Sequence, residues 1–118
     1  MKIEKFEDVI AWQKARLLTK QIYYVFKDCR DFNFCDQIKR ASISVMNNIA
    51  EGFERQTDKE MAHFLFIAKG SSGEIRSLLY LSQDLNYLDQ TTFQQLFDLT
   101  QEISRVLSGL IRSLRPSS

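Results

Sequence analysis

The chain has 118 residues, 44% of them hydrophobic and 26% charged, a composition typical of a single globular domain, which we expect to span residues 1–118. Sixteen basic and fifteen acidic residues give a formal net charge of +1, which excludes a global field that would draw the protein onto nucleic acid or an anionic membrane. The first twenty residues intersperse charges among apolar residues, so we expect no membrane association and a cytoplasmic location.

The first predicted helix runs from about Asp8 to Asp28, with Trp12 at the edge of its apolar stripe. Apolar residues three or four apart form that stripe, which comprises Ala11, Ala15, Leu18, Ile22 and Phe26.

A short connection, Cys29 to Phe34, follows the first helix and contains Asp31 and Asn33, whose side chains compete with the helical backbone. The chain is therefore expected to reverse here. No other cysteine exists to complete a four-ligand metal site around Cys29 and Cys35, and we expect both to be free thiols.

The second predicted helix, about Cys35 to Arg55, has two distinct faces. Its buried stripe is predicted to hold Ile38, Ala41, Ser42, Val45, Ile49 and Phe53. A ladder of polar residues projects elsewhere: Arg40, Ser44, Asn47 or Asn48, Glu51 and Arg55. Two interpretations are open for this ladder: a solvated face with i,i+4 charge pairs such as Glu51–Arg55, or a polar network at a subunit interface that satisfies Asn48 and Glu51.

The third predicted helix, about Asp58 to Asn86, starts with capping-box spacing between Thr57 and Glu60, so the second and third helices should form a tight hairpin. Its predicted inner face comprises Phe64, Ile67, Ser71, Ile75, Leu78 and Leu85. Its predicted outer face comprises Ala62, Phe66, Gly73 and Tyr80, with Leu65 beside them. A helix with apolar groups in two directions indicates subunit contact, because a small bundle has only one core.

Gly70-Ser71-Ser72-Gly73 lies inside this helix, where each glycine costs about 1 kcal/mol of helix propensity relative to alanine. Close approach of another helix would compensate, and the second helix offers small residues for it: Ala41, Ser42, Ala50 and Gly52. A phosphate-binding loop is excluded, because it requires a preceding strand and a lysine-hydroxyl ending.

The fourth predicted helix, capped by Thr91 or Thr92 and ended by Pro116, has the most regular spacing in the chain. Its seam comprises Phe93, Leu96, Thr100, Ile103, Leu107, Leu110 and Leu114. Four helices with short connections predict an all-α protein, an antiparallel up-down-up-down four-helix bundle.

The sequence shows no nucleophile paired with a base and no converging set of metal ligands. Glu51, Glu60 and Glu74 could meet across the hairpin, but carboxylate metal sites in bundles use two Glu-x-x-His motifs, and only Glu60–His63 has that spacing. His63 is interpreted as a helix-surface or interface residue. We therefore expect no enzyme activity, no metal and no cofactor.

Basic residues near the predicted hairpin are candidates for nucleic-acid binding: Lys39, Arg40, Arg55, Lys59, Lys69 and Arg76. In one subunit, scattered solubilising charge is the simpler interpretation, but a ring of subunits would multiply the patch into a basic stripe for phosphates.

Three segments resemble the bacterial four-helix-bundle family named for ribosomal RNA intervening sequences. They are Phe6-Glu-Asp-Val-Ile-Ala-Trp12-Gln13-Lys-Ala15, then Gln37 to Arg55 around Asn48-Ile49-Ala50-Glu51-Gly52, and then Glu60, Phe64-Leu65 and Ile67-Ala68-Lys-Gly70-Ser71-Ser-Gly-Glu74. The resemblance covers nearly the whole chain.

The resemblance implies a cytoplasmic homopentamer, in agreement with the two-sided third helix, and the family name does not establish an activity. A relative of the family, the accessory variability determinant of diversity-generating retroelements, is similar in assembly and binds nucleic acid and a reverse transcriptase, but it is strongly basic whereas this chain is nearly neutral. The expected function is a non-enzymatic homo-oligomeric scaffold that binds nucleic acid or a ribonucleoprotein. The alternative is a protein-only adaptor that docks a partner protein on the assembled ring.

The residues expected to set helix packing or the subunit interface are Asn48, Glu51, Gly52, Ala62, Phe66, Gly70, Ser71, Gly73, Glu74 and Tyr80.

Overall fold

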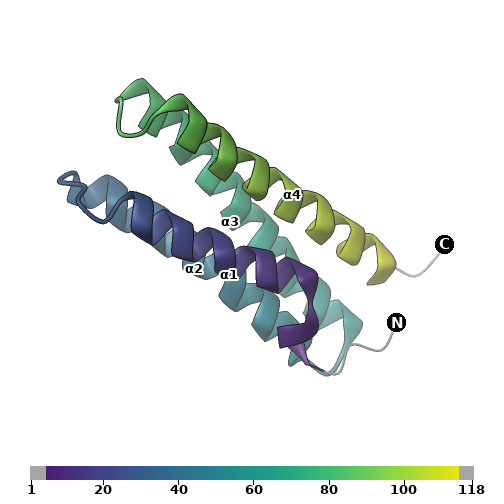
Figure 1. Ribbon diagram of the computed structural model, residues 1–118. Coiled ribbons are helices and arrows are strands. Elements are labelled where there is room, and N and C mark those ends of the chain that lie inside the picture. The colour runs from purple at the N-terminus through teal and green to yellow at the C-terminus, as the bar shows by residue number, and fades with distance from the viewer. Residues whose placement is uncertain (1–4, 115–118) are drawn as a thin grey trace.

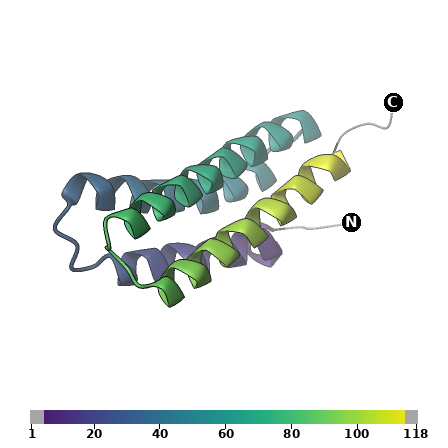
Figure 2. The ribbon, with the colours of Figure 1, turned by 90° about the horizontal axis from the view of Figure 1, so that it is seen from above.

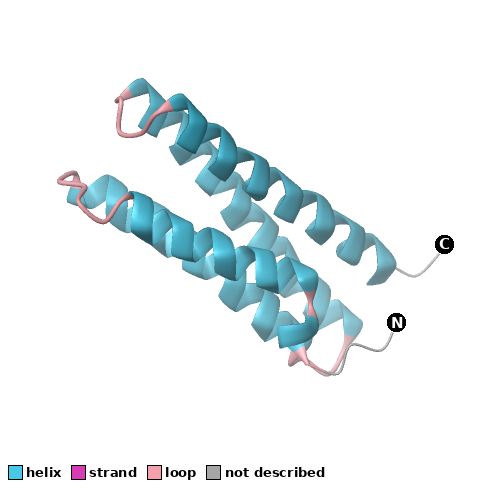
Figure 3. Ribbon diagram, viewed as in Figure 1, coloured by secondary structure: helices cyan, strands magenta, loops and turns pink. Residues whose placement is uncertain are grey.

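The computed structural model describes residues 5–114, and every regular element in that range is a helix (Figures 1 and 3). A short 3-10 helix, η1 (Phe6–Asp8), precedes α1 (Ile10–Val25), α2 (Phe32–Phe53), α3 (Asp58–Asp84) and α4 (Gln90–Leu114). The all-α class and the four helices are confirmed. The predicted stop at Pro116 lies outside the described residues.

The helices lie side by side in an elongated body of 46 × 23 × 21 Å. Figures 1 and 2 show the α1–α2 and α3–α4 connections at one end, and the α2–α3 connection at the other, beside the start of α1 and the end of α4. Contacts join α1 to α2, α2 to α3, α3 to α4 and α4 to α1. Each helix therefore has two neighbours around one shared core.

The buried stripes of α1 and α2 agree with the sequence patterns. All five predicted residues of α1 are buried, and so are those of α2 except Phe53, which is partly buried and packs against the core. In α4 the predicted seam is buried as far as Leu107, after which Ile111 takes the core position and Leu110 is only partly buried. The shift arises because an α-helix turns every 3.6 residues, so a strict heptad drifts around it.

The predicted inner face of α3 is wrong except at Ile75. The buried residues are Leu65, Ala68, Ser72, Ile75, Leu79 and Ser82. Phe64, Ser71 and Leu78 are partly buried, whereas Ile67 and Leu85 are exposed. Because α3 packs between α2 and α4, it carries apolar residues on both flanks as well as on the core side, and periodicity alone does not distinguish the three.

Side-chain caps begin α2 and α3. The carboxylate of Asp31 accepts the backbone N–H of Phe34 at 3.2 Å, so α2 starts three residues earlier than predicted. The hydroxyl of Thr57 accepts the backbone N–H of Glu60 at 3.1 Å and donates to the Glu60 carboxylate at 2.9 Å, which confirms the predicted start of α3. Both caps satisfy backbone donors that have no partner inside the helix.

The α3–α4 connection differs from the prediction at the start of α4. Asn86 adopts a left-handed φ of 59°, and the backbone N–H of Tyr87 donates to the carbonyl of Ser82 at 2.8 Å, which is the Schellman pattern of a helix end. Asp89, not Thr91 or Thr92, caps α4, since its carboxylate accepts the backbone N–H of Thr92 at 2.7 Å. Asp89 lies three residues before Thr92, so its carboxylate reaches the backbone N–H of Thr92, which has no partner inside the helix.

Cys29 and Cys35 form a disulfide, so the expectation of free thiols is wrong. The α1–α2 connection reverses within a few residues and brings the Cα atoms of the two cysteines to 6.6 Å. That separation lies in the range a disulfide can bridge. The spacing of Cys29 and Cys35 in the sequence does not predict this disulfide, because the distance between the two Cα atoms depends on how tightly the connection turns.

Candidate oligomer interface

One side of α3 points away from the core and carries apolar side chains. At 100° per residue, Phe66, Gly70, Ser77 and Leu81 lie opposite the buried stripe, and we call these four residues the outer face of α3. Phe66 is 45% exposed and Leu81 43%, while Ile67 and Leu85 lie beside this face and are also exposed. Large apolar side chains that recur along one exposed helix face are typical of an interaction surface.

Gly70 lies in the middle of the outer face. A Cβ atom built on Gly70 would meet no other atom within 4 Å. A glycine in a helix interior costs about 1 kcal/mol relative to alanine, and nothing in the described chain approaches Gly70 to compensate. Its position therefore leaves room for the close approach of a helix from another molecule.

The close approach predicted inside the hairpin occurs at Gly52 instead. A Cβ atom on Gly52 would lie 3.2 Å from the backbone oxygen of Met61 and 3.3 Å from the Cβ atom of Phe64. Gly52 is buried and lets α2 and α3 come together near their connection. At Gly73 the nearest such contact is the Arg76 guanidinium at 3.7 Å, which is ordinary van der Waals distance.

Ala62, Gly73 and Tyr80 lie on the α4 side of the outer face and not at its centre, and Leu65, which the sequence pattern placed beside them, is fully buried in the core. The Tyr80 ring contacts two aromatic rings of α4, with centroid distances of 5.8 Å to Phe93 and 5.3 Å to Phe97. Ala62 is partly buried and lines a hollow with Ser113 and Leu114 of α4. Gly73 lies on the same side by helical spacing. These residues therefore form the flank of α3 that packs on α4.

The polar ladder of α2 divides into two parts. Asn48 donates from Nδ2 to the backbone oxygen of Ser44 at 2.8 Å and to its hydroxyl at 3.0 Å. The Ser44 hydroxyl in turn lies 2.8 Å from the Ser71 hydroxyl, so this part is a network between α2 and α3 within one chain. Glu51 instead forms an exposed i,i+4 ion pair with Arg55. Such a pair contributes a few tenths of a kcal/mol, about 0.3–0.5.

The six candidate basic residues are not gathered into one patch. Arg40 pairs with Asp36 at 2.8 Å in the first half of α2, whereas Arg55 lies just beyond the C-terminal end of that helix. The rise of an α-helix places these two arginines about 22 Å apart. Arg76 turns toward α4, where it donates to the Ser104 hydroxyl at 2.7 Å.

The remaining three lysines lie on separate surfaces. The Lys39 ammonium lies 5.2 Å from the centroid of the Tyr23 ring on α1. Lys59 and Lys69 are exposed on α3 and form no ion pair with any described residue. A single subunit therefore presents isolated cations, not a continuous basic groove.

The acidic residues of the hairpin do not converge on one site. Glu51 pairs with Arg55, Glu60 accepts from Thr57, and Glu74 is exposed. His63 is exposed and contacts the Phe64 ring edge-on, with centroids 5.5 Å apart. Within residues 5–114, no three His, Cys, Asp or Glu side chains are grouped so that they could hold a metal ion.

One polar contact, at the end of the molecule that holds the α1–α2 and α3–α4 connections, was not predicted. The Tyr87 hydroxyl donates to the Asp31 carboxylate at 2.6 Å and so joins the two connections at that end. This hydrogen bond, together with the one from the Phe34 backbone, lowers the pKa of Asp31, and it raises the pKa of Tyr87. The capping position of Asp31 is readable from the sequence, but its pairing with Tyr87 depends on the tertiary structure.

Comparisons with known proteins agree with this architecture. Residues 7–109 match the family described as 23S rRNA-intervening sequence protein. A crystal structure from Bacteroides thetaiotaomicron VPI-5482, of a protein with unknown function from the S23 ribosomal protein family, has a similar fold, with a TM-score of 0.83 at 21% sequence identity. The match covers 87% of this chain and 99% of that chain. No curated protein matches the chain.

Proposed function

The chain belongs to the family of 23S rRNA-intervening sequence proteins, and we propose that it is a non-enzymatic scaffold that assembles with copies of itself through the outer face of α3. The observation that carries this proposal is Gly70, which has open space around it on an exposed apolar helix face. A homopentamer is the proposed assembly. Each subunit would place its outer face against a neighbour, so that helix backbones approach closely at Gly70.

The proposal accounts for large apolar side chains of α3 that stay exposed to solvent in a single subunit. Ile67 and Leu81 are 39% and 43% exposed, although the core of the same helix is completely buried at Leu65 and Leu79. Burial of apolar area on association stabilises a complex by about 25 cal/mol per Å² before the entropic cost of association is subtracted. A contact that includes Ile67, Leu81 and Leu85 can supply such area.

The proposed subunit is an antiparallel, up-down-up-down bundle. Gly52, near the end of α2, meets Met61, near the start of α3, while Ser44, earlier in α2, meets Ser71, later in α3. No helix within residues 5–114 is long and apolar enough to cross a membrane. The cytoplasm is the proposed location of the assembly.

Light scattering measures the mass of the assembly in solution and tests the proposal. We expect a mass of five subunits for the wild-type protein and of one subunit for Leu81→Glu, because the substitution places a charge in the apolar contact. Leu17→Glu is the matched control, since Leu17 is 46% exposed on α1, away from the outer face. It should retain the wild-type mass. A monomeric wild-type protein would contradict the proposal, as would loss of assembly in both variants.

Nucleic-acid or ribonucleoprotein binding by the assembled ring is a second candidate function. It is favoured by Lys59 and Lys69, whose exposed cations are not neutralised by an ion pair among the described residues. Copies of the two lysines around a ring would form a basic stripe, and each phosphate that a stripe neutralises adds to the salt dependence of binding.

A binding titration with mixed RNA or DNA at low salt separates this function from a protein-only adaptor that docks a partner on the ring. Changing Lys69 to glutamate should weaken salt-sensitive binding while the oligomer mass stays constant. Lys20→Glu, on the exposed surface of α1, is the control. If nucleic acid does not bind the wild-type oligomer, the adaptor is favoured.

A further inference from the structure

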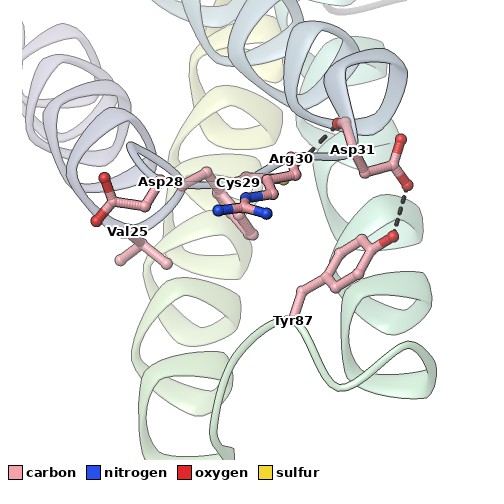
Figure 4. A pocket seen from close by; sticks show the side chains of 7 residues that line it. Val25, Asp28, Cys29, Arg30, Asp31 and Tyr87 are labelled. Atoms are coloured by element: carbon pink, nitrogen blue, oxygen red, sulfur yellow. Dashed lines mark hydrogen bonds between the residues drawn. The ribbon is translucent and has the colours of Figure 1, made fainter.

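The end of the molecule with the α1–α2 and α3–α4 connections is held together by contacts that the proposed assembly does not use. The Cys29–Cys35 disulfide closes the α1–α2 connection on itself, and Asp31 lies inside that closed loop. Asp31 accepts the backbone N–H of Phe34 through Oδ1 at 3.2 Å and the hydroxyl of Tyr87 through Oδ2 at 2.6 Å. Figure 4 shows the Tyr87 side chain reaching from its own connection toward Asp31. One carboxylate therefore joins the start of α2 to the α3–α4 connection.

We propose that the Cys29–Cys35 disulfide is a reversible latch, opened by a dithiol, that controls the junction between Asp31 and Tyr87. In the closed state the disulfide confines the seven residues from Cys29 to Cys35 and keeps the Asp31 carboxylate directed toward Tyr87. In the open state this segment gains conformational freedom, and both hydrogen bonds of Asp31 weaken.

Accessibility identifies the sulfur that a reductant reaches first. Cys29 is partly buried and lines an open surface hollow of about 560 Å³ (Figure 4). Cys35 also lines a surface hollow, beside Phe32 and Asp36, but it is only 5% exposed, so the difference in exposure is what separates the two sulfurs. Asp28, Arg30 and Asp31 line the hollow at Cys29 and carry a net negative charge between them, so a small neutral dithiol suits that hollow better than an anionic thiol. Attack is therefore directed to the Sγ atom of Cys29.

The exchange reaction is balanced by the two thiols of the reductant. One thiolate attacks Sγ of Cys29, the disulfide bond breaks, and its electron pair leaves on Sγ of Cys35 as a thiolate. The second thiol then attacks the mixed disulfide and releases Cys29, and the dithiol is oxidised to its own disulfide. The two thiol protons of the reductant end on Cys29 and Cys35. Cys35 lies in the first turn of α2, where the helix N-terminus stabilises a departing thiolate.

A reversible disulfide also suits the proposed cytoplasmic location. This argument, unlike the others, rests on that proposed location. Disulfides in the reducing cytoplasm are mainly transient or redox-sensing, whereas permanent ones belong to oxidising compartments. The contact geometry of Cys29, Asp31 and Tyr87 does not depend on that location or on the assembly.

Hydrogen exchange measured with and without dithiothreitol tests the latch. Reduction should speed amide exchange about fivefold in residues 30–35 and in residues 85–89, the change expected when a helix N-cap is lost. The middle of α1 should not respond. A Cys29→Ser, Cys35→Ser double variant should exchange at the reduced rate and ignore dithiothreitol. In Tyr87→Phe, reduction should affect residues 30–35 only, while Tyr24→Phe, an exposed tyrosine of α1, should behave as wild type.

Two outcomes would overturn the latch. One is an air-purified protein in which both cysteines react with an alkylating agent, because the disulfide would then be absent. The other is unchanged exchange of residues 85–89 after reduction. Treatment with the neutral monothiol 2-mercaptoethanol adds a separate check, since the adduct should form on Cys29, and an adduct on Cys35 would contradict the assigned attack. The same measurements on Leu81→Glu keep a failure of the latch distinct from a failure of assembly.

Discussion

Glycine has opposite roles on the two sides of α3, at Gly52 of the neighbouring helix α2 and at Gly70 of α3 itself. On the side toward α2, Gly52 is buried under Met61 and Phe64, where a Cβ atom would meet the α3 backbone oxygen at 3.2 Å. On the outer face, Gly70 has no atom near the position of a Cβ. The first glycine lets two helices of one chain pack closely, whereas the second leaves an open position on an exposed helix surface. The structural role of a glycine in a helix therefore depends on which element, if any, packs against it.

Truncation of core and outer-face residues should give the largest contrast in stability. Leu65→Ala removes a fully buried side chain of α3 and should lower the free energy of unfolding by about 3 kcal/mol. Ile67→Ala, two residues away and 39% exposed, should change it by less than about 0.5 kcal/mol in a monomeric background. Urea unfolding of both variants in the Leu81→Glu protein measures the difference, and equal losses would contradict the assigned faces of α3.

Filling the space at Gly52 should produce the next largest effect. Gly52→Val forces methyl groups toward the backbone of Met61, which cannot move aside without shifting α3, and should destabilise the protein by about 2 kcal/mol. Gly109→Val is a suitable control in α4, because a Cβ atom there would meet only the flexible end of Arg112, at 3.9 Å. Thermal unfolding monitored by circular dichroism compares the two. A neutral Gly52→Val would show that the seam between α2 and α3 is looser than its contacts indicate.

Substitution at Gly70 should have the opposite sign. Gly70→Ala should stabilise the isolated subunit by about 1 kcal/mol, because it gains helix propensity and meets no atom. The same change should weaken assembly if helices approach closely at Gly70. Unfolding in the Leu81→Glu background and light scattering of the single variant read these two effects separately. A destabilised monomer would refute the open environment of Gly70.

The smallest effect should appear in the pH dependence at the end of the molecule, where a hydrogen bond and not a close approach joins two parts of the chain. The pKa of Asp31 is lowered chiefly by the Tyr87 hydroxyl, so its stabilising contribution is present above the unfolded-state pKa and is lost as pH falls through the lower folded-state pKa. We therefore expect stability to decline below about pH 4. Tyr87→Phe should shift the Asp31 titration, followed by NMR, toward its ordinary pKa, and Tyr24→Phe should leave it unchanged.

Sequence patterns were most reliable where a helix buries a single stripe. Ala15, Leu18, Ile38 and Val45 were all placed correctly in the core, because α1 and α2 each carry one clear apolar periodicity. The cap at Thr57 was also readable, since it depends on residues three positions apart. The patterns failed for α3, where Phe64 and Ile67 have the same hydrophobic character as Leu65 but different neighbours.

The sequence pattern located apolar residues of α3 outside the core but did not separate the sides of that helix. The sequence pattern placed Phe66, Ala62 and Tyr80 together on a predicted outer face and assigned Gly70 to close approach of another helix. In the structure Phe66 is exposed, whereas the Tyr80 ring contacts Phe93 and Phe97 of α4. The sequence also predicted free thiols at Cys29 and Cys35, which the structure joins, and it did not pair Asp31 with Tyr87, 56 residues away. Each of these outcomes depends on how segments distant in the sequence meet.

Local chemistry in the sequence was therefore sufficient to determine the number of α-helices, the cap at Thr57 and the resemblance to one family. These features depend on residues a few positions apart, so the chain encodes them directly. The tertiary structure alone decided which side of α3 is core and which glycine is covered, that Cys29 and Cys35 form a disulfide within one connection, and that Tyr87 joins the α3–α4 connection to Asp31. Those features depend on which helices become neighbours, because an apolar or small residue is buried only when another element covers it.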